Sequence, residues 1–253
     1  MSNQLNLSTA AYQHIHGKLL SGALEAGAVV SELSLAKEIG ISRTPVRGAI
    51  QKLEEEGLVE RVPRVGTIVR RPSVREIIDL YELRESIERF AAVRAAEEGS
   101  PQEIAHMGKF CRAMRDVAEE VRRQPDRLGN SQQYRRFLAV DLAFHTAIVK
   151  CTGNRRLFKT LNEARAFIRI FCSRRHDVLT LNTVAGAYGH HQRILHAIER
   201  RDPERAGRCM VDHIRASSAG AAKYLQQHDR MNQMNEINMA IHDDLTEEIA
   251  DLI

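Results

Sequence analysis

The stretch from residue 41 to residue 59, ISRTPVRGAIQKLEEEGLV, predicts an amphipathic helix that decides the fold of the N-terminal region. Thr44 can cap this helix with its hydroxyl, and Pro45 suits the first helical position, where a missing backbone N–H has no cost. Gly57 is typical of the residue that ends a helix. Apolar residues at helical spacing form one buried stripe, which consists of Val46, Ile50 and Leu53. The segment therefore predicts a helix with a single buried face.

Two arginines near the start of this helix, Arg43 and Arg47, lie off the apolar stripe. A helix that buries one side and offers arginines at its N-terminal end is typical of a DNA recognition helix. Many surface helices also carry arginines, so the interpretation depends on the neighbouring elements.

The segments on either side complete a small module. Ser8 is expected to cap a helix over residues 9–20, and a second helix is expected over residues 32–39. After the arginine-bearing helix, two β-branched runs at residues 58–62 and 67–69 flank a turn with a glycine, which predicts a hairpin. Three helices followed by a hairpin form a winged helix-turn-helix, which places its third helix in a DNA major groove.

The run from residue 31 to residue 69, SELSLAKEIGISRTPVRGAIQKLEEEGLVERVPRVGTIV, resembles the DNA-binding domain of the GntR family of bacterial transcription regulators. The resemblance covers residues 5–72, with the helix-turn-helix at residues 32–51. It implies DNA contacts by Arg43, Thr44 and Arg47 on the recognition helix and by Arg64 and Gly66 in the wing. Many family members have an arginine where this chain has Leu33, and this difference is expected to shift operator preference.

The composition is that of an ordinary globular protein of 253 residues, with 43% apolar and 28% charged residues. The N-terminus lacks a basic region followed by an apolar run, and no segment approaches the roughly 18 consecutive apolar residues of a membrane span, so a cytoplasmic protein is expected. The formal charge of +4 permits nucleic-acid binding without establishing it. Widely separated cysteines indicate neither a disulfide framework nor a thiolate zinc site, and they are expected to be reduced: Cys111, Cys151, Cys172 and Cys209.

A second, all-helical domain is predicted over residues 74–228. Ser73 and Glu76 have the spacing of a capping box, which marks the domain boundary and starts the first helix. Glycines, prolines and polar stretches then divide the chain into helices over residues 74–98, 101–123, 131–152, 154–177, 182–200 and 202–228. No strand-like alternation follows Val69, so an antiparallel bundle is expected. Residues 229–253 are expected to form either a seventh helix or a loose tail.

An aspartate and a histidine four residues apart, Asp141 and His145, are expected on one face of the third helix of this domain, where they can bind one metal ion. A pair with this spacing is more often a hydrogen bond on a helix surface. Two further histidines on later helices, His191 and His213, favour the metal site. Three neutral imidazoles and one carboxylate suit zinc, nickel, manganese or iron better than calcium or magnesium, and zinc is predicted from ligand type alone.

These four residues and their intervals resemble the FCD domain, the helical effector domain of FadR-type members of the GntR family. In that domain an aspartate and three histidines hold a metal, and the resemblance implies the same role for the four residues here. His190 is the alternative to its neighbour His191. The resemblance also implies that Arg84 pairs with the carboxylate of a small organic acid, although a salt bridge from Arg84 to Glu85 or Glu88 is an equally good interpretation.

Together the two domains predict a ligand-responsive transcription regulator, a repressor that binds a palindromic operator as a homodimer and responds to a small carboxylate-bearing metabolite. The bundle is expected to supply the dimer contact, and no enzymatic activity is expected. The alternative is a metal-dependent hydrolase, because an open position on an Asp/His₃ metal centre can activate water. A third interpretation keeps the regulator and makes the metal purely structural.

Overall fold

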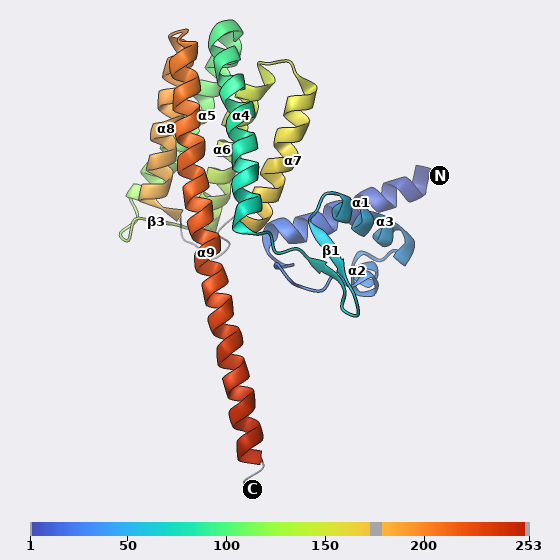
Figure 1. Ribbon diagram of the computed structural model, residues 1–253. Coiled ribbons are helices and arrows are strands. Elements are labelled where there is room, and N and C mark those ends of the chain that lie inside the picture. The colour runs from blue at the N-terminus through green and yellow to red at the C-terminus, as the bar shows by residue number, and fades with distance from the viewer. Residues whose placement is uncertain (1, 173–178, 251–253) are drawn as a thin grey trace.

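The computed structural model describes residues 2–172 and 179–250, and the side chains of residues 6–172 and 179–227. Its N-terminal part is a winged helix-turn-helix (Figure 1). The helices are α1 (Ser2–Ser21), α2 (Glu32–Ile39) and α3 (Arg43–Glu55), and the strands are β1 (Val59–Val62) and β2 (Gly66–Val69). The two strands pair antiparallel, with Val62 opposite Gly66 at the tip of the wing. The predicted fold of this domain is confirmed.

Two predicted helix starts are wrong. α1 begins close to the N-terminus, so Ser8 lies inside the helix instead of capping it. α3 begins at Arg43 with Ser42 as its N-cap residue, so Thr44 is already helical. Serine and threonine follow one another closely in both segments, and their shared capping preference does not choose among them. Pro45 still lies in the first turn of α3, where its missing N–H leaves no hydrogen bond unmade.

An apolar core joins the three helices of this domain to the hairpin. Ile15 and Leu19 of α1 share this core with Ile50 and Leu53 of α3, and all four side chains are fully buried. The buried face of α3 is therefore the stripe predicted from the sequence. The opposite face, which carries the arginines, is left open to solvent.

The rest of the described chain forms a helical bundle, as predicted. Its helices are α4 (Val74–Glu98), α5 (Pro101–Arg122), α6 (Ser131–Lys150), α7 (Arg155–Cys172), α8 (Leu181–Glu199) and α9 (Pro203–Ala250). Capping boxes at Ser73 and Ser100 start α4 and α5. The expectation of no further strand is wrong, because β3 (Leu128–Gly129) pairs antiparallel with β4 (Leu179–Thr180). Strands of two residues are too short to show an alternating pattern.

The last helix is longer than predicted. The sequence predicts an end near residue 228, but α9 continues through Ala250 as one helix and projects beyond the bundle (Figure 1). This favours the helical alternative for the C-terminal segment. The predicted end of α7 at residue 177 lies outside the described residues. None of the helices described here is both long and apolar enough to cross a membrane.

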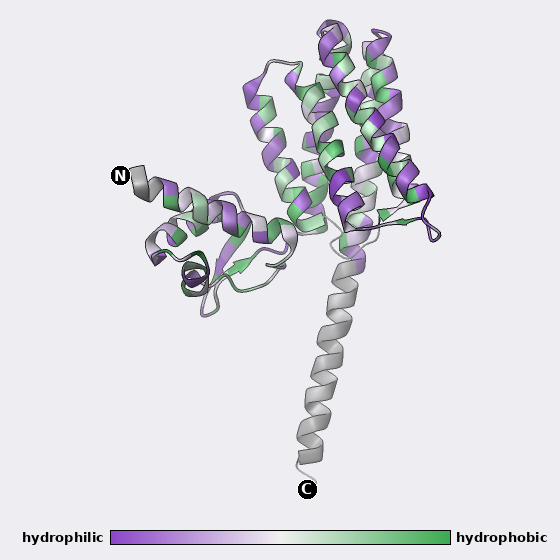
Figure 2. Ribbon diagram, turned by 180° about the vertical axis from the view of Figure 1, so that it is seen from behind, coloured by the Kyte–Doolittle hydropathy of each residue, from purple (hydrophilic) through white to green (hydrophobic). Residues whose placement is uncertain are grey.

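Hydrophobic positions gather on the faces that the bundle helices turn toward one another (Figure 2). α7 belongs to two cores at once. Its Leu161 and Ile168 lie in the core of the bundle, whereas its Ile170 and Phe171 are buried in the core of the winged domain. α7 is therefore packed against both domains. The four cysteines are free, as expected.

Candidate metal centre and nucleic-acid interface

Four side chains from three helices converge inside the bundle: Asp141 and His145 of α6, His191 of α8 and His213 of α9. One ligand atom from each residue lies within 4.8 Å of all the others. The Nε2 atom of His145 is 3.0 Å from Nε2 of His213 and 3.3 Å from Nε2 of His191. The structure thus brings together all four residues that the sequence selects as metal ligands.

The spacing of these atoms fits a metal ion. Oδ1 of Asp141 is 3.3 Å from Nε2 of His191 and 3.8 Å from Nε2 of His145. Metal bonds of about 2.0–2.1 Å place neighbouring ligand atoms about 3 Å apart at right angles and about 3.3 Å apart at tetrahedral angles. Three imidazole nitrogens and one carboxylate oxygen are also a donor set that zinc and related ions prefer. The residues present therefore fit a divalent transition metal.

A buried carboxylate behind the cluster sets the orientation of one ligand. Nδ1 of His145 lies 2.6 Å from Oε2 of Glu88 on α4. This contact favours the proton on Nδ1, which leaves the lone pair of Nε2 free to bind a metal. The sequence considers Glu88 only as a partner of Arg84, because its distance along the chain from His145 carries no recognisable spacing.

The protonation states in the cluster suit metal binding. Burial lowers the pKa of His145, although the Glu88 carboxylate opposes this shift. Burial also lowers the pKa of His213 well below its usual value, and the charges of His145 and His191 add to the effect. Burial raises the pKa of Asp141, but the hydrogen bond with His191 and the charges of the three histidines outweigh it and hold this pKa below its usual value. Neutral imidazoles and an ionised carboxylate are the forms that bind metals.

Glu88 also holds two arginines. Nε of Arg84 donates to Oε1 of Glu88 at 2.9 Å, and Nη2 of Arg165, on α7, donates to Oε2. Burial raises the pKa of Glu88, but Arg165, Arg84 and His145 together hold it well below its usual value. The salt bridge from Arg84 to Glu88 is therefore present. The sequence interpretation missed Arg165, because no motif distinguishes it from the other arginines of α7.

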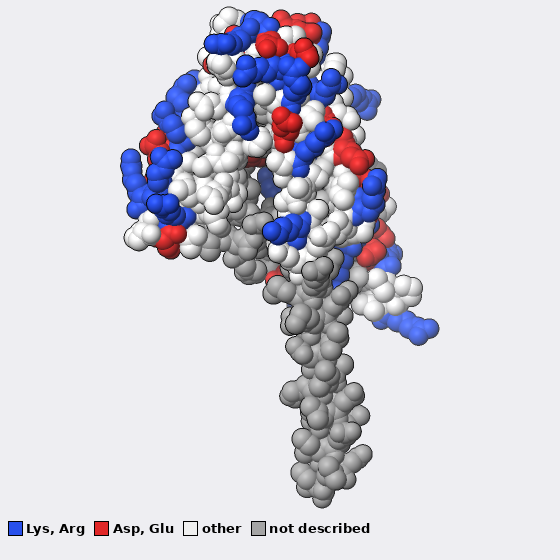
Figure 3. All heavy atoms as spheres, turned by 60° about the vertical axis from the view of Figure 1, so that its left-hand side comes forward, with Lys and Arg blue, Asp and Glu red and all other residues white. Residues whose placement is uncertain are grey.

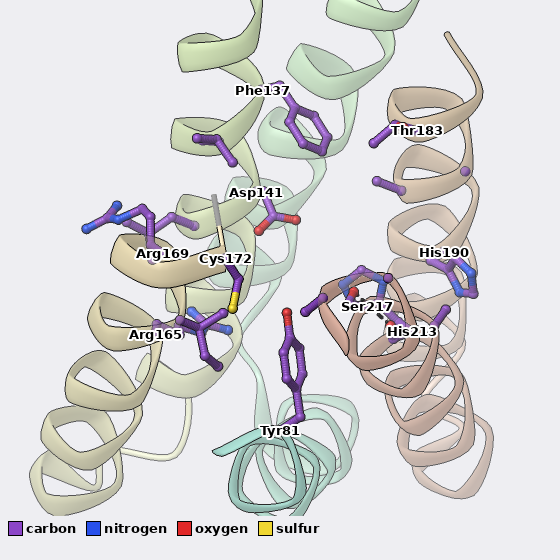
Figure 4. Close-up of a pocket in the computed structure, with 18 of the residues that line it drawn as sticks. Tyr81, Phe137, Asp141, Arg165, Arg169, Cys172, Thr183, His190, His213 and Ser217 are labelled. Carbon is purple, nitrogen blue, oxygen red and sulfur yellow. Dashed lines mark hydrogen bonds between the residues drawn. The ribbon is translucent and has the colours of Figure 1, made fainter. Parts of the chain in front are cut away.

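A cavity of about 480 Å³ opens beside the cluster. Its wall contains Arg84, Asp141, Arg165 and His213 together with aromatic and aliphatic side chains. The Tyr81 hydroxyl and the Asp141 carboxylate both point into it (Figure 4). Figure 3 shows a hollow in this part of the molecule, bordered largely by uncharged residues. The site can therefore admit a small organic molecule next to the metal ligands.

The structure separates the two neighbouring histidines of α8. His191 is fully buried in the cluster, with its ring stacked on Phe144 at a centroid distance of 4.3 Å. His190 lies in the cavity wall and belongs to no group of ligand atoms among the described residues. This geometry supports the choice of His191 over His190.

The arginines of α3 share one carboxylate. Arg47 donates through Nε and Nη2 to the two oxygens of Glu32 on α2, each at 3.1 Å, and Arg43 donates through Nη2 at 3.1 Å. The Arg43 and Arg47 side chains remain 57% and 62% exposed. Thr44 is exposed between them, and Leu33 of α2 is 52% exposed. The face of the domain that carries these arginines is thus exposed, and the hydrogen bonds to Glu32 already orient both side chains.

The tip of the wing is exposed as well. Arg64 and Gly66 have φ angles of 68° and 105°, both in the left-handed region. Gly66 adopts this region without steric cost, whereas Arg64 is held there by the tight turn between the strands. The five predicted DNA-contacting residues are therefore all on the surface of the winged domain.

Two family models match the chain: that of bacterial regulatory proteins of the gntR family over residues 7–69, and that of the FCD domain over residues 79–216. The chain belongs to the GntR family of transcription regulators. It carries an FCD domain after its DNA-binding domain, and the FCD match contains all four residues of the cluster.

Known proteins of similar length support this assignment. A "Probable D-xylose utilization operon transcriptional repressor" of Paenarthrobacter nicotinovorans is 29% identical over 218 residues, which span 85% of this chain and 90% of that protein. The structure of E. coli McbR/YncC matches with a TM-score of 0.68 at 18% identity, over 86% of this chain and 97% of that chain. A transcriptional regulator GntR from Rhodococcus sp. RHA1 matches with a TM-score of 0.64 at 21% identity, over 85% of this chain and 96% of that chain. The two structures confirm the GntR fold.

Zinc is expected to raise the melting temperature of the metal-free GntR protein. An ion that binds only the folded state stabilises it by about 2.7 kcal/mol at a free concentration of 100 times its Kd. His213→Ala removes one of the four ligands and is expected to abolish most of this gain. The measurement is thermal unfolding with and without zinc, after dialysis against a chelator.

Two histidines of the neighbouring helix α8 are the controls. His196→Ala changes an exposed side chain, and His190→Ala changes the neighbour of a ligand, so both variants should keep the zinc-dependent gain. An equal gain in His213→Ala and in the unmodified protein would place the zinc elsewhere.

Proposed function

We propose that this GntR protein is a metal-dependent repressor whose DNA binding responds to a small organic acid. In this proposal a homodimer binds a palindromic operator through its winged domains, and the FCD domain binds a divalent metal and the acid. The observation that supports it best is one chain that joins an exposed arginine-bearing helix to a buried four-ligand cluster beside a cavity. Zinc is the metal we propose first, with nickel, manganese and iron as alternatives.

The proposed DNA contacts follow from the exposed arginines. Arg43 and Arg47 carry planar guanidinium groups that suit guanine edges or phosphates, and Thr44 lies between them at the start of α3. Arg64 and Gly66 would approach the minor groove as the wing lies along the duplex. The repressor role is supported by the P. nicotinovorans relative, whose name describes it as a repressor.

Arg47→Ala is expected to weaken binding to the operator by about 1–3 kcal/mol, the usual contribution of an arginine that reads a base. The operator would be selected from genomic DNA fragments, and affinities would be measured by gel shift on operator and on random DNA. Arg123→Ala is the control, because this exposed arginine follows α5, in the helical domain. Equal losses on both DNAs would assign Arg47 to phosphate contacts.

Glu32 has a separate proposed role as a positioning residue. Its carboxylate accepts hydrogen bonds from Arg43 and Arg47, so it restricts both side chains before DNA arrives. Hydrogen bonds to both arginines are also the main reason that the pKa of Glu32 lies below its usual value. The entropy of these two long side chains is then already reduced in the free protein, so less entropy is lost when DNA binds. This favours sequence-specific contacts. The same negative charge weakens attraction to phosphates in general.

Glu32→Gln is therefore expected to raise affinity for random DNA and to lower the ratio of operator to random binding by roughly tenfold, the effect of about 1.4 kcal/mol. Gel shifts at several salt concentrations would measure both quantities. Glu38→Gln is the matched control, because it removes the same charge from α2 at a side chain that pairs with Lys18 and His14. An unchanged ratio in Glu32→Gln would show that the arginines need no such support.

The proposed effector site is the cavity beside the cluster. Four protein ligands leave positions open on an ion that takes five or six ligands, and a carboxylate could occupy them. Arg84 lies in the same wall, where its guanidinium suits a carboxylate. The hydrolase alternative would use the same open positions to activate water. The match to the gntR family and the similarity to a repressor favour a transcription regulator over a hydrolase.

An organic acid that raises the melting temperature of the zinc-loaded protein is expected to change its operator affinity by 5–150-fold, the usual range of coupling between two sites. His191→Ala should abolish both effects if the metal takes part in acid binding. A purely structural metal predicts instead a lower melting temperature with an intact dose-response. Gel shifts of the operator complex, titrated with a panel of small acids, would separate these outcomes.

A further inference from the structure

We propose that the effector carries two anionic groups, and that Arg165 of α7 receives the second of them. The inference rests on the proposed function, in which the first group binds beside the metal ligands and Arg84. It narrows the effector to a short acid with two negative charges, such as a dicarboxylate.

Arg165 is buried without enough partners. Its side chain is 8% exposed, and Nη2 is satisfied by Glu88. Nε and Nη1 are both buried and have no hydrogen-bond acceptor among the described residues. Burial lowers the pKa of Arg165, and Glu88 opposes that shift. A buried guanidinium with two unused donors is costly, and an anionic acceptor in the cavity would satisfy one of them with a charge-assisted hydrogen bond.

The position of Arg165 suits a ligand in the cavity. Arg165 lies on the α7 side of the pocket, and His213 and Ser217 of α9 lie on the other side (Figure 4). Through Glu88 it is also linked to the cluster, because Oε2 of Glu88 contacts both Arg165 and Nδ1 of His145. Between the Arg165 guanidinium and Nε2 of His145 lie only the Glu88 carboxylate and the His145 ring. A short molecule can span this separation.

The charges around the cavity favour a dianion. Three arginines lie in the cavity wall: Arg84, Arg165 and Arg169. Two buried or partly buried carboxylates lie against them and the cluster, those of Glu88 and Asp141. A divalent metal then adds two positive charges to a buried region. A monoanion would compensate only one positive charge of the metal, whereas a dianion would compensate two, and uncompensated buried charge is strongly unfavourable.

The test compares each diacid with its own monoamide. Malonate, succinate and glutarate would be titrated by calorimetry into the zinc-loaded full-length protein, each beside the monoamide, which has the same length but one charge fewer. The tightest diacid is expected to bind roughly 10–100-fold better than its monoamide, because one charge-assisted hydrogen-bonded pair is lost. Metal analysis after each titration would show that the zinc is retained.

Variants of Arg165 assign the difference to this residue. In Arg165→Gln, the diacid should bind no better than its monoamide. Arg165→Lys keeps the charge without the planar guanidinium and should recover part of the preference for the diacid over the monoamide. The same variant tests the inference if Arg165→Gln does not fold. Lys159→Gln is the control, because Lys159 is an exposed residue of the same helix that pairs with Glu163.

The outcomes separate the inference from the proposed function. If monoacids and diacids bind equally, or if both Arg165 variants keep the preference, the second anion is not at Arg165 and only this inference fails. If neither class of acid binds the zinc-loaded protein, the inference and the acid-sensing part of the proposed function fail together.

Discussion

The helical domain depends on the buried carboxylate of Glu88. This side chain is completely inaccessible to solvent, and its two oxygens are shared by Arg84 on its own helix, Arg165 on α7 and His145 on α6. A buried charge is tolerated only when it is paired, so these partners must keep their positions for the domain to fold. The carboxylate thereby fixes the relative placement of three helices. It also orients a candidate metal ligand and an arginine of the cavity with the same pair of oxygens.

The Glu88 carboxylate both stabilises the helical domain and orients His145. Because Oε2 of Glu88 lies against Nδ1 of His145, it favours the tautomer that presents Nε2 to His191 and His213. A second partner of this kind usually strengthens metal binding, since the ligand is held in place before the ion arrives. The imidazole of His191 is held differently, by stacking on Phe144. The cluster is therefore supported partly by charge and partly by packing.

The sequence predicted the features that local spacing carries. The buried stripe of α3, the capping box at Ser73 and the wing hairpin are all patterns within a few residues, and the structure contains each of them. The four metal-ligand candidates were also found, because their spacing resembles a known domain. The exact cap of α3 was missed, since Ser42 and Thr44 have the same preference and tertiary packing decides between them.

Contacts between distant helices were not predictable in this way. Glu88 and Arg165 are 77 residues apart, and nothing in the composition of α4 or α7 indicates that they meet. The paired strands β3 and β4 are also far apart in sequence, and each is only two residues long. Such pairs depend on how the bundle closes, and single-sequence patterns contain no information about that closure.

α7 gives the cavity a physical route to the DNA-binding domain besides the linker. Arg165 and Ile168 line the cavity, whereas Ile170 and Phe171 of the same helix lie in the core of the winged domain. Protein interiors are close-packed, so α7 cannot move at the cavity without moving these two side chains. A ligand that displaced Arg165 would therefore act on the winged domain through α7.

The linker is tied to the same helix. Arg70 donates to the Gly57 carbonyl at the end of the α3 turn and to the Glu76 carboxylate at the start of α4, and its guanidinium lies 6.0 Å from the ring centre of Phe167 on α7. The linker and the packing of α7 against the winged domain thus meet at Arg70. Because Gly57 directly follows α3 and its cap, a displacement of α7 that moved Arg70 would change the support at the end of α3. A change in the cavity would therefore reach the end of the helix that carries Arg43 and Arg47 through α7 and Arg70.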